Sequence, residues 1–299
     1  MGISGDEFHL KSWVEVGLHL AFRQIGPVWA GREVEGAAVT SETRATTRGQ
    51  TLSSWSGQSL IDVKRTGRIF GWLFIGTFIT SIPARLLFIH GLHASWSNVH
   101  FVPGNTSTAS LKWGAVLEFG LIITQLGTAI VIYPLGRRQS ETVSLGYVSA
   151  RTMESVFAAI GLISIISVVS TADALSRTHG VGATALAVQG NSLAHTYEWA
   201  FQWGPGLVAG IGNGLLLGYL MYRSGLVPPR MALLGLVGGS VLILNFVLIL
   251  TGVYVNGSTA SGLLTLPEAV WELYLGIYCA WKGFRTESPI ARSEVVLPH

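Results

Sequence analysis

A few charged side chains interrupt stretches of sequence that are otherwise almost entirely apolar. Glu118, Glu198, Glu268 and Glu272 are the acidic members of this group, and Arg85 is the basic one. A charged group inside a membrane-spanning helix is costly, so each of these residues raises the question of a functional role. Carboxyl groups in such places can carry negative charge into a binding site, or serve as general acid and base. Their spacing by itself does not indicate a reaction.

Helical spacing places these residues on polar faces. Glu268 and Glu272 lie one turn apart on one face. Before and along the fourth apolar stretch, a single face is formed by His195, Glu198, Gln202, Gly206, Gly210 and Asn213. In a helical bundle such faces turn inwards, away from lipid. We therefore predict an outward-opening, carboxylate-lined cavity whose ligand-binding residues are Arg85, Glu118, His195, Glu198, Gln202, Asn213, Glu268, Trp271 and Glu272.

The alternative interpretation is that these carboxylates are structural and pair with Arg85 and with donors on neighbouring helices. Four carboxylates near one arginine leave an excess of negative charge, so some would be protonated or face water. Arg151 and Glu154, on the third apolar stretch, are expected nearer the cytoplasmic side, where they can pair with each other at i,i+3.

The composition indicates that most of the chain is surrounded by lipid. Its mean hydropathy is +0.49, and only 12% of its 299 residues are charged, about half the charged fraction of a soluble domain. A helix needs about 20 apolar residues to cross the hydrocarbon core. Six stretches qualify: about 69–90, 113–135, 147–170, 199–222, 231–253 and 262–281. We predict an all-α, polytopic membrane bundle of six transmembrane helices, because the apolar runs are long and continuous rather than alternating.

The basic residues predict the orientation. They cluster before the first stretch and after the second, fourth and sixth, at Lys64, Arg65, Arg68, Arg137, Arg138, Arg223, Arg230, Lys282 and Arg285. The opposite loops carry few basic residues, which places both termini in the cytoplasm. The net charge of +3 is explained in this way, and no nucleic-acid partner is expected. The domain organisation is then an N-terminal extension (1–65), disordered or weakly structured, a transmembrane domain (66–285) and a cytoplasmic tail (286–299).

The glycines predict close helix packing. Gly206, Gly210, Gly214 and Gly218 recur every four residues on the fourth stretch, and Gly235 and Gly239 lie on the fifth. Small residues at this spacing let helix backbones approach closely. Pro205 is expected to loosen or kink the fourth helix near its outer end.

The histidines and the single cysteine do not form a recognisable metal motif. His90, His93 and His100 lie in the first outer region and His179 in the second, at spacings that match no metal site. We expect no metal and no cofactor. The partners expected are membrane lipid and a small-molecule or isoprenoid-like ligand, and the oligomeric state is open.

Three blocks of the sequence resemble a known family. They are YPLGRRQSETVSLGYVSARTMESV (133–156), WGPGLVAGIGNGLLLGYLMYRSGLVPPRMALLGLVGG (203–239) and PEAVWELYLGIYCAWKGF (267–284). These blocks resemble, in their order, the bacterial integral membrane proteins grouped as domain of unknown function 4386. The resemblance implies a multi-pass protein of the bacterial cytoplasmic (inner) membrane and supplies no catalytic residues. The chain departs from the family's pattern in its long N-terminal extension and in the run HTYEW before the glycines.

Three functions are therefore open. The first is a carrier or sensor that binds a small or amphiphilic ligand. The second is a membrane-embedded enzyme acting on a lipid-soluble substrate by isomerase or terpene-cyclase type acid–base chemistry. Its catalytic candidates are Glu118, Glu198, Glu268 and Glu272, with Trp203, Trp271 and Tyr274 as an aromatic lining for positive charge. The third is a non-catalytic scaffold, which the glycine ladders favour.

Overall fold

The computed structural model describes residues 62–93, 101 and 104–292, and in this part of the chain the regular structure is entirely helical. Most of the expected N-terminal extension (1–65) and half of the expected tail (286–299) lie outside the described residues. The helices are α3 (Val63–Leu92), α4 (Thr108–Gly136), α5 (Glu141–Leu175), α6 (Val181–Phe201), η1 (Gln202–Val208), η2 (Gly210–Leu217), α7 (Gly218–Ser224), α8 (Pro229–Leu250), α9 (Thr259–Lys282) and α10 (Pro289–Arg292).

Capping residues explain where several helices begin. The side chains of Asp62, Ser140 and Ser258 accept hydrogen bonds from backbone N–H groups in the first turns of α3, α5 and α9. Pro229 opens α8 at a position where a missing N–H costs nothing. Gly225, in the left-handed conformation, ends α7 and allows the short turn into α8.

Five helical segments are long and apolar enough to cross a membrane. They are Val63–Leu92, Thr108–Gly136, Glu141–Leu175, Val181–Ser224 and Pro229–Leu250. The sixth expected span forms α9, a helix of 24 residues whose two glutamates, Glu268 and Glu272, lower its mean hydropathy. The all-α membrane fold is confirmed, whereas the count of six spans and the cytoplasmic termini stay predictions.

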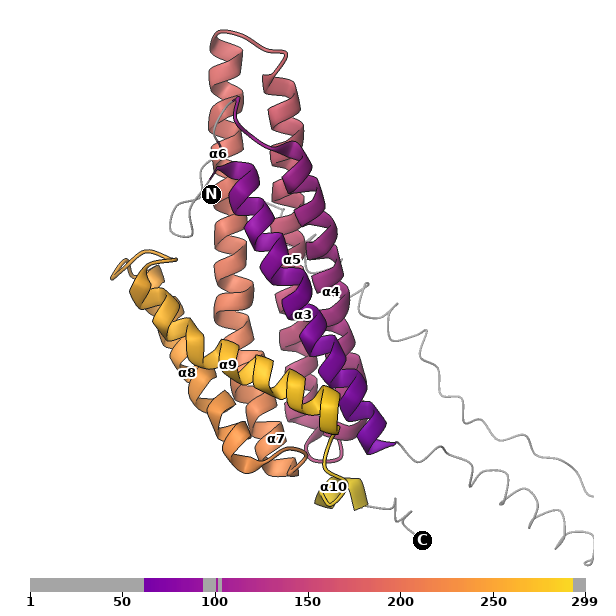
Figure 1. Cartoon of the computed structure of the whole chain (residues 1–299). Helices are drawn as coiled ribbons and strands as arrows, with labels where there is room; N and C mark the ends of the chain where they lie inside the picture. The colour runs from indigo at the N-terminus through magenta and orange to yellow at the C-terminus, as the bar shows by residue number, and fades with distance from the viewer. Residues whose placement is uncertain (1–61, 94–100, 102–103, 293–299) are drawn as a thin grey trace, which may run out of the picture. The chain divides into compact units, whose positions relative to one another are not determined.

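Neighbouring helices pack as a bundle. α3 lies against α4 and α9, α5 lies against α4 and α6, and α8 packs on both η2 and α9. Figure 1 shows α9 (yellow) crossing α3 (indigo) near the end of the molecule where α10 lies. We call this the basic end, because the helix ends there carry the clustered basic residues: Lys64, Arg65, Arg137, Arg138, Arg223, Arg230, Lys282 and Arg285.

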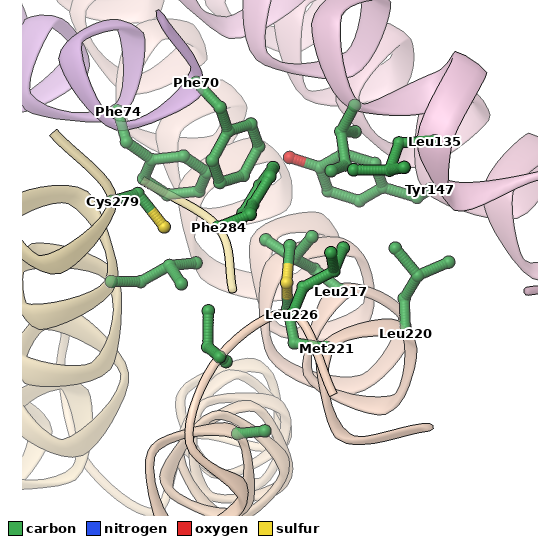
Figure 2. Packing of buried hydrophobic residues seen from close by; sticks show 14 of the residues in the cluster. Phe70, Phe74, Leu135, Tyr147, Leu217, Leu220, Met221, Leu226, Cys279 and Phe284 are labelled. Atoms are coloured by element: carbon green, nitrogen blue, oxygen red, sulfur yellow. The ribbon is translucent and has the colours of Figure 1, made fainter. Parts of the chain in front are cut away.

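Two separate apolar cores hold the bundle together. The first core lies at the basic end and joins Phe70 and Phe74 of α3, Leu135 of α4, Met221 of α7 and Cys279 of α9 (Figure 2). The second core lies towards the opposite end, where Phe88, Leu111, Ile165, Val168 and Tyr197 pack together. Along α3, α4, α5 and the fourth helix, the residues between the two cores include most of the buried polar side chains.

The fourth expected span is part of one continuous helix of 44 residues, Val181–Ser224, that contains two π-helical segments. Pro205 lies within η1, and the helix continues through it in the wider hydrogen-bonding register. In an α-helix the ring of a proline clashes with the carbonyl four residues earlier, and the wider register of a π-helix gives that ring more room. Loosening at Pro205 therefore takes the form of a change in helix type.

The glycine ladder packs closely against a neighbouring helix, as the sequence predicts, and the structure shows that this helix is α8. A Cβ atom added at Gly214 would lie 2.2 Å from the Cα atom of Gly239, which is backbone and cannot move aside. Similar close approaches involve Gly210 with Gly239 and Gly218 with Leu236. Gly206, the first member of the ladder, has no such contact with α8. The close packing of the fourth and fifth spans thus begins at Gly210.

Candidate functional site

A cavity of about 220 Å³ lies inside the helical bundle, along the stretches that separate the two apolar cores. Its walls come from α3, α4, α5, the α6–η1 segment, α8 and α9. One part of the lining is charged and another is apolar, which is the usual composition of a small-molecule site. The charged residues are Arg85, Glu118, Arg151, Glu154, Glu268 and Glu272; the apolar ones include Phe78, Ile82, Leu121, Phe201, Pro205 and Leu242.

Glu268 is the most unusual member of the lining. Its side chain is buried, with 2% exposure, and neither carboxyl oxygen has a hydrogen-bond partner among the described residues. The carboxyl fits beside two glycines: a Cβ added at Gly238 would lie 2.6 Å from Oε2, and one at Gly214 would lie 3.0 Å from it. The glycines thus make room for a buried carboxyl group that the bundle leaves without a partner.

Glu272, one turn further along α9, is tied into a network of side chains. Asn213 donates a hydrogen bond from Nδ2 to Glu272 Oε1 at 2.5 Å, and its Oδ1 accepts one from Arg151 Nη1 at 3.2 Å. Arg151 Nη1 also donates to Glu154 Oε2 at 2.7 Å, and Gln125 Nε2 donates to Glu154 Oε1 at 2.9 Å. This network links α4, α5, η2 and α9 across the centre of the bundle.

Arg85 and Glu198 form a second charged group at the side of the cavity towards the second core. Arg85 Nη2 donates to Glu198 Oε2 at 2.9 Å, and the guanidinium group lies over the rings of Tyr197 and Phe201. Asn256, in the loop between α8 and α9, donates to the other oxygen of Glu198. The pair therefore joins α3 to α6 and attaches the α8–α9 loop to both.

A second set of hydrogen bonds holds the same loop to α8 and α9. Tyr254 donates from its hydroxyl group to Asn245 Oδ1 at 2.6 Å, and Asn245 Nδ2 donates to Thr265 Oγ1 at 3.1 Å. Thr265 is exposed and also lines the cavity. The α8–α9 loop is thus fixed beside the margin of the cavity.

The charges that line the cavity do not balance. Four carboxyl groups (Glu118, Glu154, Glu268 and Glu272) face two guanidinium groups, and one of these, that of Arg85, also pairs with Glu198. Buried charges in proteins are normally paired. At least two carboxyl groups therefore have no protein cation to balance them within this lining.

The exposed members of the cavity lining lie on α3 and α9, which indicates that the cavity approaches the protein surface between these two helices. These helices touch closely near the basic end, where a Cβ added at Gly71 would lie 2.1 Å from the backbone nitrogen of Ala280. They diverge towards the opposite end, as Figure 1 shows. Ile82 of α3, 52% exposed, and Thr265 of α9 both line the cavity in the diverging part. Of these two helices, α3 is one of the five that are long and apolar enough to cross a membrane, and α9 packs against it.

The structure brings together most of the site residues expected from the sequence. Arg85, Glu118, Glu268 and Glu272 line the cavity, Glu198 pairs with Arg85, and Asn213 bonds Glu272. Gln202 is buried but is not part of the lining. Trp271 packs against Gly235 and donates from Nε1 to the carbonyl of Asn213. His195 is exposed and lies in a different hollow, with Trp199 and Trp203.

Several residues of the site are not among those expected. Arg151 and Glu154 form the predicted i,i+3 pair, but they line the same cavity as Glu268 and Glu272. Gln125 was visible as a polar residue on the face of Glu118, and this spacing could have identified it. Nothing in the sequence pattern connects Asn256, in a loop, with Glu198.

No group of three or more His, Cys, Asp or Glu side chains is arranged to hold a metal ion within residues 62–93, 101 and 104–292.

No curated protein and no solved structure matches the chain significantly. One family model matches residues 69–283, which is more than half of the chain and includes every residue that lines the cavity. The chain is therefore a member of the family described as "Domain of unknown function (DUF4386)".

Proposed function

We propose that this integral membrane protein binds a small amphiphilic molecule in the central cavity and acts as a carrier or a sensor. The observation that carries the proposal is the unbalanced charge of the cavity, above all the buried, unpartnered carboxyl group of Glu268. A polar layer that served only to join helices would satisfy its own groups, because an unpaired buried charge destabilises the fold. The unpartnered carboxyl group and the adjoining apolar wall suit a ligand with one polar and one apolar end.

The glycine ladder, which favoured the scaffold alternative, is used for packing within the chain. The glycine ladder of the fourth span packs against Gly239 and Leu236 of α8, inside the chain. It is therefore not available as a surface for assembly with other proteins.

The enzyme alternative shares the carboxyl group of Glu268, since a buried carboxyl is also what a general acid requires. The three aromatic residues expected to line the site for cyclase-type chemistry are not among the residues that line the cavity. Trp203 and Trp271 are not part of the lining, and Tyr274 is 49% exposed. Of the rings that do line the cavity, those of Tyr197 and Phe201 already face the guanidinium group of Arg85.

A cavity-filling substitution tests the proposal. Ala269 lines the cavity, so Ala269→Phe should abolish the saturable rise in unfolding temperature that a set of cationic, anionic, zwitterionic and neutral amphiphiles produces in lipid nanodiscs. Ala260→Phe, at an exposed position of the same helix, is the matched control. If no amphiphile stabilises the protein, or if both variants respond like the natural chain, the cavity is not a binding site.

The carrier and the sensor are separated by transport. Proteoliposomes loaded with an amphiphile that passes the first test should release it faster than liposomes containing Ala269→Phe if the protein is a carrier. Equal release from both, with binding intact, indicates a sensor. Mass spectrometry of the same samples would reveal a converted product if the protein is an enzyme.

A further inference from the structure

We propose that the ligand is an amphiphilic ammonium ion with at least two N–H groups, and that it enters from the lipid between α3 and α9. The inference rests on the function proposed above and specifies the ligand of the same site. It is supported by a buried carboxyl group without a partner, Glu268, next to an opening bordered by the exposed residues Ile82 and Thr265.

The charge of the site selects a cation. Arg151 Nη1 is bonded to Glu154 and Asn213, and Arg85 Nη2 is bonded to Glu198, so each guanidinium group already has a carboxylate counter-charge, although Arg151 Nη2 has no hydrogen-bond partner among the described residues. The carboxyl groups of Glu268 and Glu272 lie one turn apart on the cavity wall, and no arginine or lysine of the described residues forms an ion pair with either. A ligand cation placed between them would supply the missing charge in an environment where water does not weaken the attraction.

The unpartnered carboxyl oxygens of Glu268 favour a cation that has N–H groups to donate. Both oxygens of Glu268 lack a donor among the described residues. A primary or secondary ammonium group can donate to such oxygens, and charge-assisted bonds of this kind are about twice as strong as neutral ones. A quaternary ammonium ion has no hydrogen to donate and is usually bound by aromatic faces. Here the rings of Tyr197 and Phe201 already face Arg85, which leaves Phe78 as the remaining ring of the lining.

The apolar lining between Glu268 and the exposed margin of the cavity favours a ligand with an apolar body. From Glu268 the lining continues along α3 and α9 through Phe78, Ile82 and Ala269, which leads from the buried carboxyl to the exposed margin. An apolar chain lying there would remain in contact with lipid while the ammonium group reached Glu268. An inorganic cation would gain nothing from this apolar wall, and hard cations such as calcium require six to eight oxygen ligands.

A matched series of probes tests the chemistry. Hexylammonium, hexyltrimethylammonium and hexanol share one apolar chain and differ only at the head group. Their apparent affinities are measured in nanodiscs from the dependence of the unfolding temperature on concentration. Hexylammonium should bind the natural chain at least about tenfold more tightly than either analogue, a ratio equivalent to about 1.4 kcal/mol. The double variant Glu268→Gln/Glu272→Gln should lose this preference, whereas Glu287→Gln, an exposed glutamate outside the cavity, should keep it.

The route is tested by kinetics. Ile82→Trp should slow the association of hexylammonium severalfold, because it narrows the margin of the cavity. Ile79→Trp is the control, since Ile79 is equally a surface residue of α3 (61% exposed) but does not line the cavity. Equal association rates in the two variants would overturn entry between α3 and α9.

The outcomes separate this inference from the function on which it rests. Tight binding of hexyltrimethylammonium or hexanol, or undiminished binding of hexylammonium by the double glutamine variant, would overturn the assignment of an N–H-bearing cation. If such binding is still abolished by Ala269→Phe, the cavity remains a binding site for another class of amphiphile. If no amphiphile binds in a manner sensitive to Ala269→Phe, both proposals fail.

Discussion

Replacing Glu154 and Glu268 one at a time with glutamine should change the stability of the bundle in different directions. Both side chains are buried, at 4% and 2% exposure, and both line the same cavity. They differ in their partners. Glu154 accepts hydrogen bonds from Arg151 at 2.7 Å and from Gln125 at 2.9 Å, whereas Glu268 accepts none from the described residues.

The magnitudes follow from those partners. Glu154→Gln leaves the buried guanidinium of Arg151 without its closest counter-charge, and breaking a buried ion pair in this way costs about 3 kcal/mol or more. Glu268→Gln breaks no hydrogen bond shown by the structure and removes a buried group that lacks a charged partner, so stability should stay the same or rise by about 1 kcal/mol. The two variants should therefore differ by about 3 to 4 kcal/mol, which corresponds to about 6 to 16 °C in unfolding temperature at about 2 to 4 °C per kcal/mol.

The chain contains its own reporter for this measurement. Cys279 is the only cysteine in the sequence and is buried in the first core, so a thiol-reactive fluorogenic dye labels it only when the bundle opens. Unfolding curves are recorded for the natural chain and both variants in the same lipid nanodiscs without added ligand. The variant Cys279→Ala provides the blank.

A particular result would contradict the reasoning. If Glu268→Gln lowered the unfolding temperature as much as Glu154→Gln, Glu268 would have a stabilising partner in the folded protein. The carboxyl group would then be structural, and the argument for an open binding group would fail.

Three further substitutions, together with Gly262→Ala as a control, test the packing around the site. Gly239→Ala should destabilise the bundle by about 1 to 3 kcal/mol, because the new Cβ would lie 2.5 to 2.6 Å from backbone atoms of η2; Gly262→Ala, with nothing within 4 Å, should be neutral or stabilising by up to about 1 kcal/mol in the same dye assay. Asn256→Asp should place a second carboxylate against Glu198 and speed amide hydrogen exchange in the α8–α9 loop, and unchanged exchange would show that this contact is not maintained. Pro205→Ala should change stability by less than about 1 kcal/mol, since the π-helical register already accommodates the proline; a gain near the roughly 3 kcal/mol expected in an α-helix would contradict that account.

Much of the fold follows from the sequence because lipid imposes a simple pattern. The apolar runs predict the helices, and the four-residue spacing of Gly210, Gly214 and Gly218 predicts close packing against a neighbouring helix, which the structure shows to be α8. The helix ends are less predictable. α5 begins at Glu141, six residues before the apolar run from 147, and the fourth helix begins at Val181, far before the run from 199. Helices do not stop where hydropathy falls, because caps and packing set their ends.

The site was only partly predictable for the same reason. When depth is judged from the apolar run alone, Arg151 lies near the cytoplasmic margin; in the folded helix it lies nearly three turns from the first residue, beside Thr128 and Asn213. A change of helix type cannot be foreseen from a proline and glycines. The residues on either side of η1, such as His195 and Asn213, therefore do not share the single face that α-helical spacing predicts.

The π-helical segments also make the fourth helix a torsional link through the molecule. The helix carries Glu198 above these segments, Asn213 within them, and Ser224, which accepts from Ser288 near α10, below them. A change from π to α bonding in η1 or η2 would wind the helix more tightly and rotate everything beyond it about the helix axis. Asn213 would then turn relative to Glu272 and Arg151, and the basic end would turn relative to the loop held by Glu198. A change in the twist of this one helix would thereby change the positions of residues at both ends of the bundle.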